Sequence, residues 1–112
     1  MSKAEAKFLG FVRVEKLVQL MVRVHGDSMW PTLKDGQIVN ANSDVEPIVG
    51  DIAVVKHPLK KAILIKRIKQ ISFDEIFIEG DNPDPLGSED SHNFGPVSTS
   101  SIIAIIRHEY PL

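Results

Sequence analysis

The chain of 112 residues suits a single domain with its own hydrophobic core, and 43% of its residues are apolar. Thirteen Lys and Arg residues against fifteen Asp and Glu give a formal net charge of −2, so no basic field exists to hold nucleic-acid phosphates. The absence of cysteine from the sequence excludes disulfides, thiol nucleophiles and cysteine-ligated metals.

The N-terminal region is predicted not to cross a membrane. A span needs about 20 predominantly apolar residues, and no secretory signal pattern is present. Residues 2–20 fit either the start of a helix or a strand. We expect a lead-in segment, residues 1–21, before a main domain, residues 22–112, in a cytoplasmic protein with at most peripheral membrane contact. The charges that interrupt the apolar stretch are Arg13, Glu15, Lys16 and Arg23.

Short runs of alternating or β-branched residues dominate the rest of the chain. Their spacing of roughly ten residues, with Gly, Pro and Asp between them, is typical of an all-β barrel or sandwich. Residues 80–97 carry no strand pattern, and so long a loop in a compact domain is usually functional or disordered. The predicted strands are residues 21–24, 36–41, 52–55, 62–71, 75–79 and 102–106.

Ser28 follows the first of these predicted strands, two residues after Gly26. A serine at the end of a rigid strand can present its hydroxyl among backbone N–H groups, which is what an oxyanion hole needs. Alternatively, Ser28 caps a turn or helix that runs from Met29 to Leu33. The sequence pattern leaves both interpretations open.

Lys66 lies inside a predicted strand. Alternation places it on one face with Leu64 and Ile68, whereas Arg67 and Lys69 point to the other face. Desolvation on an apolar face would lower its pKa. A general base near neutral pH needs a pKa about three units below the reference value of about 10.4, equivalent to about 4 kcal/mol. The alternative is an edge lysine whose amine extends into water.

No metal site or cofactor is predicted. The acidic stretch after Gly80 does not fit a calcium loop, because Pro83 and Pro85 occupy positions that need oxygen ligands. A histidine partner for Ser28 stays open, since a catalytic triad is defined in space. Four histidines are scattered without metal-ligand spacing, namely His25, His57, His92 and His108.

Four motifs in a fixed order resemble those of type I signal peptidases. They are residues 26–33 (nucleophile box), 50–55 (Gly-Asp strand), 64–68 (lysine box) and 80–97 (final box). The sequence around His57 and Pro58 is most similar to the nickel-type superoxide dismutase maturation proteases. The resemblance implies a LexA/signal-peptidase-like barrel of short, coiled strands and hairpins. It also implies a serine endopeptidase that removes a leader or propeptide from a polypeptide substrate, here a nickel superoxide dismutase precursor.

The same resemblance assigns catalytic roles. Ser28 would be the nucleophile, with its backbone N–H as one oxyanion donor, and Lys66 the general base of a Ser–Lys dyad. Ser88 would orient the Lys66 amine. Two positions depart from the family pattern. Gly26 stands where some members have a serine that completes the oxyanion hole, and His92 replaces an arginine and is charged only when protonated.

Further residues are assigned supporting and binding roles by the resemblance. Asp81, Asn82 and Asp90 would hold the long loop beside the site, although Asp81 and Asn82 also fit simple turn formation. Met29 and Pro31, next to the nucleophile in the chain, would contact the substrate.

Three other functions compete with leader removal from a superoxide dismutase. One is a LexA-like self-cleaving regulatory domain, which needs a DNA-binding domain and a scissile bond upstream of Ser28, where no Ala-Gly pair occurs. Another is a general signal peptidase acting on secreted preproteins. The third is a catalytically inactive peptide-binding module. Turnover of a peptide in trans would separate enzyme, self-cleaving domain and inactive module.

Overall fold

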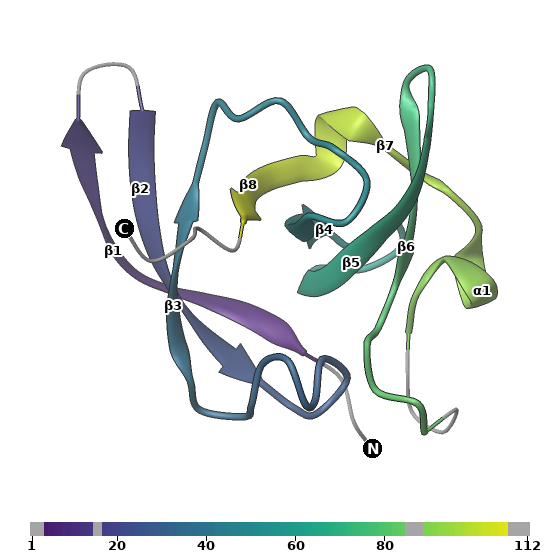
Figure 1. Cartoon of the computed structure of the whole chain (residues 1–112), viewed down its shortest axis with the longest axis horizontal. Helices are drawn as coiled ribbons and strands as arrows, with labels where there is room; N and C mark the ends of the chain where they lie inside the picture. The colour runs from purple at the N-terminus through teal and green to yellow at the C-terminus, as the bar shows by residue number, and fades with distance from the viewer. Residues whose placement is uncertain (1–3, 15–16, 85–88, 108–112) are drawn as a thin grey trace.

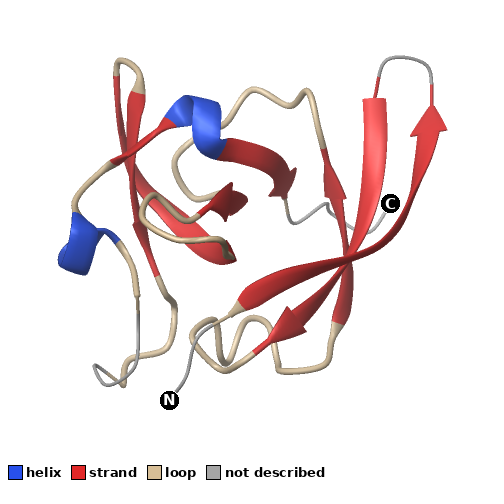
Figure 2. Ribbon diagram, turned by 180° about the vertical axis from the view of Figure 1, so that it is seen from behind, coloured by secondary structure: helices blue, strands red, loops and turns tan. Residues whose placement is uncertain are grey.

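The computed structural model describes residues 4–14, 17–84 and 89–107, which form an antiparallel sheet with little helix (Figures 1 and 2). The predicted all-β class is confirmed. No helix in these ranges is long and apolar enough to cross a membrane. The elements are β1 (Glu5–Val14), β2 (Leu17–His25), β3 (Ile38–Asn42), β4 (Ile52–Lys56), β5 (Ile63–Ser72), β6 (Glu75–Glu79), α1 (Ser91–Phe94), β7 (Val97–Ser98), the 3₁₀ turn η1 (Thr99–Ser101) and β8 (Ile102–Ile106).

The sheet curls back on itself as in the expected barrel of short strands, but its closure is uneven. Its strand order is β1-β2-β3-β8-β4-β5-β6-β7, and β1 also returns to β5. This closing contact is one residue pair, Glu5 opposite Leu64, whereas β1 pairs with β2 along nearly its whole length. The far edge is formed by β7, which has two residues. One short contact between β1 and β5 therefore closes the curl, and β6 and β7 lie beyond it in the strand order.

All six predicted runs fall within strands or overlap them, and residues 75–79 and 102–106 match β6 and β8 at both ends. Residues 2–20 fitted either a helix or a strand. Those of them that the structure describes form β1 and the first part of β2, apart from Ala4. This hairpin continues across the boundary expected between residues 21 and 22. A register shift between Phe8 and Gly10 interrupts the alternation of β1, which explains why its sequence pattern was unclear.

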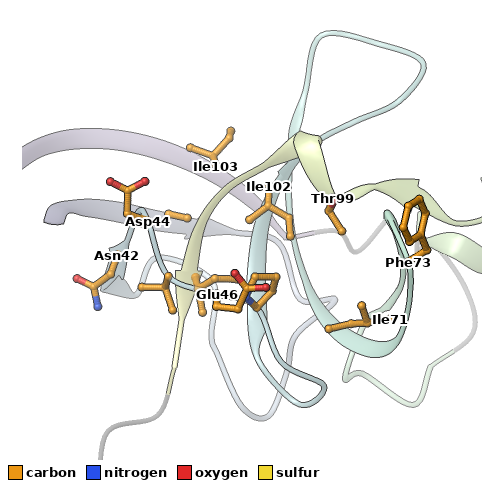
Figure 3. Close-up of a pocket in the computed structure, with 12 residues that line it drawn as sticks. Asn42, Asp44, Glu46, Ile71, Phe73, Thr99, Ile102 and Ile103 are labelled. Carbon is orange, nitrogen blue, oxygen red and sulfur yellow. The ribbon is translucent and has the colours of Figure 1, made fainter. Parts of the chain in front are cut away.

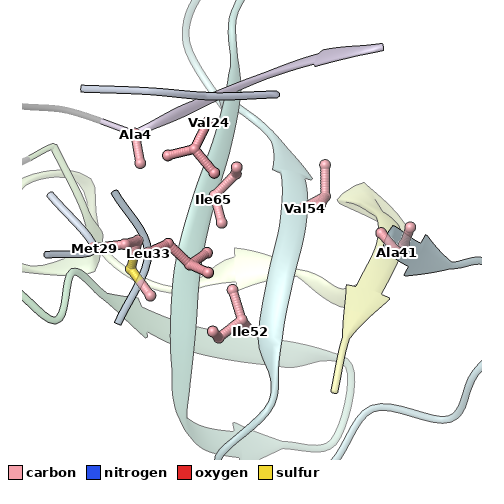
Figure 4. Packing of buried hydrophobic residues seen from close by; sticks show 9 residues of the cluster. Ala4, Val24, Met29, Leu33, Ala41, Ile52, Val54 and Ile65 are labelled. Carbon is pink, nitrogen blue, oxygen red and sulfur yellow. The ribbon is translucent and has the colours of Figure 1, made fainter. Parts of the chain in front are cut away.

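Two apolar clusters form the core on opposite faces of the central strands. Val54 on β4 is paired with Ile65 on β5, and both belong to the first cluster. The next pair, Val55 and Leu64, belongs to the second. Because both faces of β4 are covered, its sequence is a continuous apolar run. Figure 4 shows the first cluster, which is formed by Ala4, Val24, Met29, Leu33, Ala41, Ile52, Val54, Ile65 and Ala104.

We expect Ile105→Ala to lower the free energy of unfolding by about 2–5 kcal/mol, because it leaves a cavity in the second cluster. Ile105 lies on β8 between β3 and β4 and is 1% exposed. The control is Leu59→Ala, at a side chain that is 77% exposed, where the change should stay within about 0.5 kcal/mol. Urea denaturation of both variants measures the difference; equal stabilities would contradict this account of the core.

Candidate active site

The turn after β2 presents Ser28 to the interior. Gly26 adopts a φ of 89°, which favours glycine, and its N–H donates to the Asp35 carboxylate at 2.8 Å. The Trp30 N–H donates to the Asp27 carbonyl at 3.0 Å. Residues 26–33 thus form successive turns instead of the helix that Ser28 would cap. The Ser28 side chain is turned inward, and the residue is 1% exposed.

Lys66 lies on β5, and its side chain reaches Ser28. Its Nζ lies 2.9 Å from Ser28 Oγ, and the two residues are 38 positions apart in the chain. Lys66 has no exposed surface, so its amine does not extend into water. Its expected face neighbours, Leu64 and Ile68, are buried as well. Burial disfavours the ammonium form of a lysine, and the neutral amine is the form that can accept a proton from a hydroxyl.

Ser28 Oγ also accepts a hydrogen bond from the backbone of Ala4, at 2.7 Å. Among the described residues, Lys66 and Ala4 donate hydrogen bonds to Ser28 Oγ. The described histidines either bond to other residues or are exposed, so none of them contacts Ser28. Sequence reasoning missed Ala4, because a single alanine outside a clear strand carries no signal of such a contact.

Asn82 ties the loop after β6 to the backbone of Ser28 and its neighbour Asp27. Its N–H donates to the Ser28 carbonyl at 2.8 Å, and its side-chain amide donates to the Asp27 carbonyl at 2.8 Å. The predicted supporting role of Asn82 is therefore compatible with its position. These bonds constrain the backbone of Asp27 and Ser28.

Asp81 fixes the same loop to β5 and to the turn that contains Ser28 and Thr32. It accepts hydrogen bonds from Arg67, at 2.6 and 3.2 Å, and from the Thr32 hydroxyl at 2.6 Å. Burial alone would raise the pKa of Asp81, but the bonds from Arg67 and Thr32 outweigh it and hold the pKa below its usual value. Sequence analysis missed both partners; the available signal was that Arg67 faces away from its neighbour Lys66 on the strand.

Asp90 closes the other end of the loop. It caps α1, and Asn93 completes a capping box by accepting from the Asp90 N–H. The Gly80 N–H donates to the Asp90 carboxylate at 3.2 Å. His92, which replaces the family's arginine, has Nδ1 3.0 Å from the same carboxylate and Nε2 3.4 Å from Glu79.

A buried histidine, also missed at the sequence level, anchors the chain next to α1. The Leu59 N–H donates to His57 Nδ1 at 3.0 Å, so the His57 proton lies on Nε2, which faces Glu89 at 3.0 Å. Hydrogen bonds from Lys60 and from His57 hold the pKa of Glu89 below its usual value. These contacts hold Glu89, which follows Ser88 in the chain.

The remaining predicted residues have different outcomes. Ser88 lies outside the described residues. Met29 is fully buried in the first cluster, where it packs instead of meeting the solvent, and Pro31 is exposed. Among the described residues, no three His, Asp or Glu side chains converge in a way that could hold a metal ion.

The surface of the described residues carries several hollows. A groove of about 990 Å³ begins at Thr32 and Arg67, which contact Asp81, and continues past Leu33 and Ile52. A smaller hollow of about 310 Å³ lies elsewhere on the sheet, between Asn42 and Phe73 (Figure 3). Neither Ser28 nor Lys66 lines either of them.

A comparison with profiles of known protein families matches residues 8–102 to the family described as Peptidase S24-like. The matched range contains Ser28, Lys66 and the loop that holds Asp81 and Asn82. Searches of curated proteins and of solved structures find no match.

We expect Asp81→Asn to lower the free energy of unfolding near pH 7 by about 1–2 kcal/mol, less than for a fully buried pair because Arg67 and Asp81 are partly exposed. The folded-state pKa of Asp81 lies below its unfolded value of about 3.9. The stabilisation is thus complete above that value and is lost as the pH falls through the folded-state pKa.

Urea denaturation at neutral pH and in strong acid tests this expectation, with the exposed Glu75→Gln as the matched control. The two proteins, wild type and Asp81→Asn, should converge in strong acid. A stability difference that is the same at both pH values would contradict the assigned role of the Asp81 charge.

Proposed function

The chain belongs to the Peptidase S24-like family, and we propose that it is a serine endopeptidase that uses Ser28 and Lys66 as its catalytic dyad. The observation that carries the proposal is the distance of 2.9 Å between Lys66 Nζ and Ser28 Oγ, with both residues buried. A serine hydroxyl is a weak nucleophile until a neighbouring base takes its proton, and a desolvated lysine is one of the groups able to do so.

In the proposed reaction, the neutral Lys66 amine removes the Ser28 proton as Oγ attacks the carbonyl carbon of the peptide bond. The backbone N–H of Ser28 stabilises the developing oxyanion. Lys66 then donates its proton to the leaving amine, and an acyl group remains on Oγ. Water releases this acyl group in a second step, with Lys66 again acting as the base. Asn82 supports both steps by fixing the Ser28 carbonyl.

The proposed substrate is a polypeptide from which an N-terminal leader is removed, namely the propeptide of a nickel superoxide dismutase precursor. Support comes from the motifs at residues 26–33, 64–68 and 80–97 and from the sequence around His57. A general signal peptidase would instead cut the signal peptides of secreted preproteins. Incubation of the full chain with peptides that span each kind of junction, followed by mass spectrometry, distinguishes the two substrates.

A second candidate function is a single self-cleavage, as in LexA-like regulatory domains. The observation that favours it is the Ala4 backbone N–H on Ser28 Oγ, which shows that the chain's own N-terminal strand reaches the nucleophile. The two candidates differ in turnover: an endopeptidase converts many added peptide molecules per chain, whereas a self-cleaving domain converts only itself.

Ser28→Ala and Lys66→Ala should each reduce peptide cleavage by at least about 10⁴-fold, and the double variant should be little worse than either one, because the two groups act as a unit. Lys69→Ala, at an exposed position of the same strand, is the control and should retain full activity. Circular dichroism checks the fold of each variant. Activity retained by either single variant would show that the dyad is misassigned.

The cleavage rate should rise with pH between about pH 6 and pH 10, because only the neutral Lys66 amine can accept the Ser28 proton. Lys66→Met should remove activity while stabilising the fold near neutral pH, since it replaces a buried amine with an apolar side chain of similar length. Initial rates across this range, together with urea denaturation of Lys66→Met, provide the measurement. A flat rate profile would exclude a titrating lysine base.

A further inference from the structure

The edge of β5 next to the dyad is occupied by the chain's own N-terminal strand. β6 pairs with β5 from Arg67 to Ser72, so the first residues of β5 are not covered by β6. In that place, Glu5 lies opposite Leu64, and the Ile65 N–H donates to the Ala4 carbonyl at 3.1 Å. The open half of a sheet edge thus receives an extended strand, as in strand addition by a peptide.

Ala4 occupies this edge with both its backbone and its side chain. Its N–H donates to Ser28 Oγ at 2.7 Å while its carbonyl accepts from β5, so the residue bridges the nucleophile and the sheet edge. Its methyl group is completely buried in the first cluster, beside Met29 and Ile65 (Figure 4). A larger side chain at this position would collide with packed core atoms.

The arrangement leaves Ser28 inaccessible to an external peptide bond, because the residue is 1% exposed. Displacement of the strand tip would uncover it. The tip is held to β5 by the pair of Glu5 with Leu64 and by the hydrogen bond from Ile65 to Ala4, whereas β1 is held to β2 by nine pairs. The first residues of β1 can therefore leave β5 while the rest of the strand stays in the sheet.

We propose that the first half of β5 is a docking edge for one extended peptide strand, and that Ala4 and Glu5 fill it at rest and must be displaced before a substrate reaches Ser28. The proposal rests on the proposed function in that the incoming strand is the substrate. It adds to that function a resting state in which the chain blocks its own nucleophile.

Alkylation of a single thiol tests this occlusion without any need for catalysis. The sequence has no cysteine, so Ser28→Cys places the only thiol of the full-length chain under Ala4. Iodoacetamide should react with this variant slowly, and about tenfold or more faster when Ala4→Trp is added, because the indole cannot enter the core and the hydrogen bonds of the tip are lost. The control adds Lys7→Trp, at an exposed position of β1, and should change the rate by less than about twofold.

Hydrogen exchange of the wild-type protein gives a second measurement, which decides the question if the Ala4→Trp variant does not fold. The Ile65 amide, bonded to Ala4, should exchange through a local opening that is insensitive to low denaturant concentrations. The Ile68 amide lies on the same strand as Ile65 and donates to the Asp51 carbonyl. It should exchange more slowly.

Equal alkylation rates with and without Ala4→Trp in folded proteins would overturn the proposal, and so would exchange of Ile65 only through global unfolding. Loss of residues 1–3 from the wild type but not from Ser28→Ala would also overturn it, because the segment would then be a substrate. If alkylation is controlled by Ala4 but no peptide is ever cut, the docking edge stands and the proposed peptidase function fails.

Discussion

The removal of the Lys66 amine from water is the constraint on which the rest of the site depends. Moving an ammonium from water into a protein interior costs several kcal/mol, so a lysine with no exposed surface is held there by its surroundings. Leu64 and Ile68 exclude water on its face of β5, and Ser28 Oγ lies 2.9 Å from its Nζ. The desolvation that lowers the stability of the fold also favours the neutral amine, which is the form that a general base needs.

One strand, β5, organises both sides of the site because successive residues point to opposite faces. Lys66 reaches Ser28, and Arg67 binds Asp81 on the loop after β6. That loop returns to the nucleophile turn through Asn82 and the Ser28 carbonyl. Ser28 and Lys66, the loop after β6 and the turn after β2 are therefore linked to one another by hydrogen bonds, and a shift of one of them disturbs the others.

Much of the fold could be predicted from the alternation of side chains. β6 and β8 were located at both ends, and the shared face of Leu64, Lys66 and Ile68 followed from period two alone. The prediction was weakest at β1, where the register shift before Gly10 breaks the alternation. Met29 was expected at the substrate, but its packing in the core depends on how the turn folds back onto β5.

The sequence by itself determined the all-β class and most of the strands, because these depend on local alternation, and the resemblance of its motifs to a known family singled out Ser28 and Lys66. The approach of Lys66 to Ser28 joins positions 38 residues apart, and that of Ala4 joins positions 24 apart. Only the tertiary structure decided that Ala4 covers the nucleophile, that Arg67 and Thr32 share Asp81, and that His57 holds Glu89. Such contacts depend on how the sheet curls, and sheet curvature is a sum over many strand pairings that no single segment encodes.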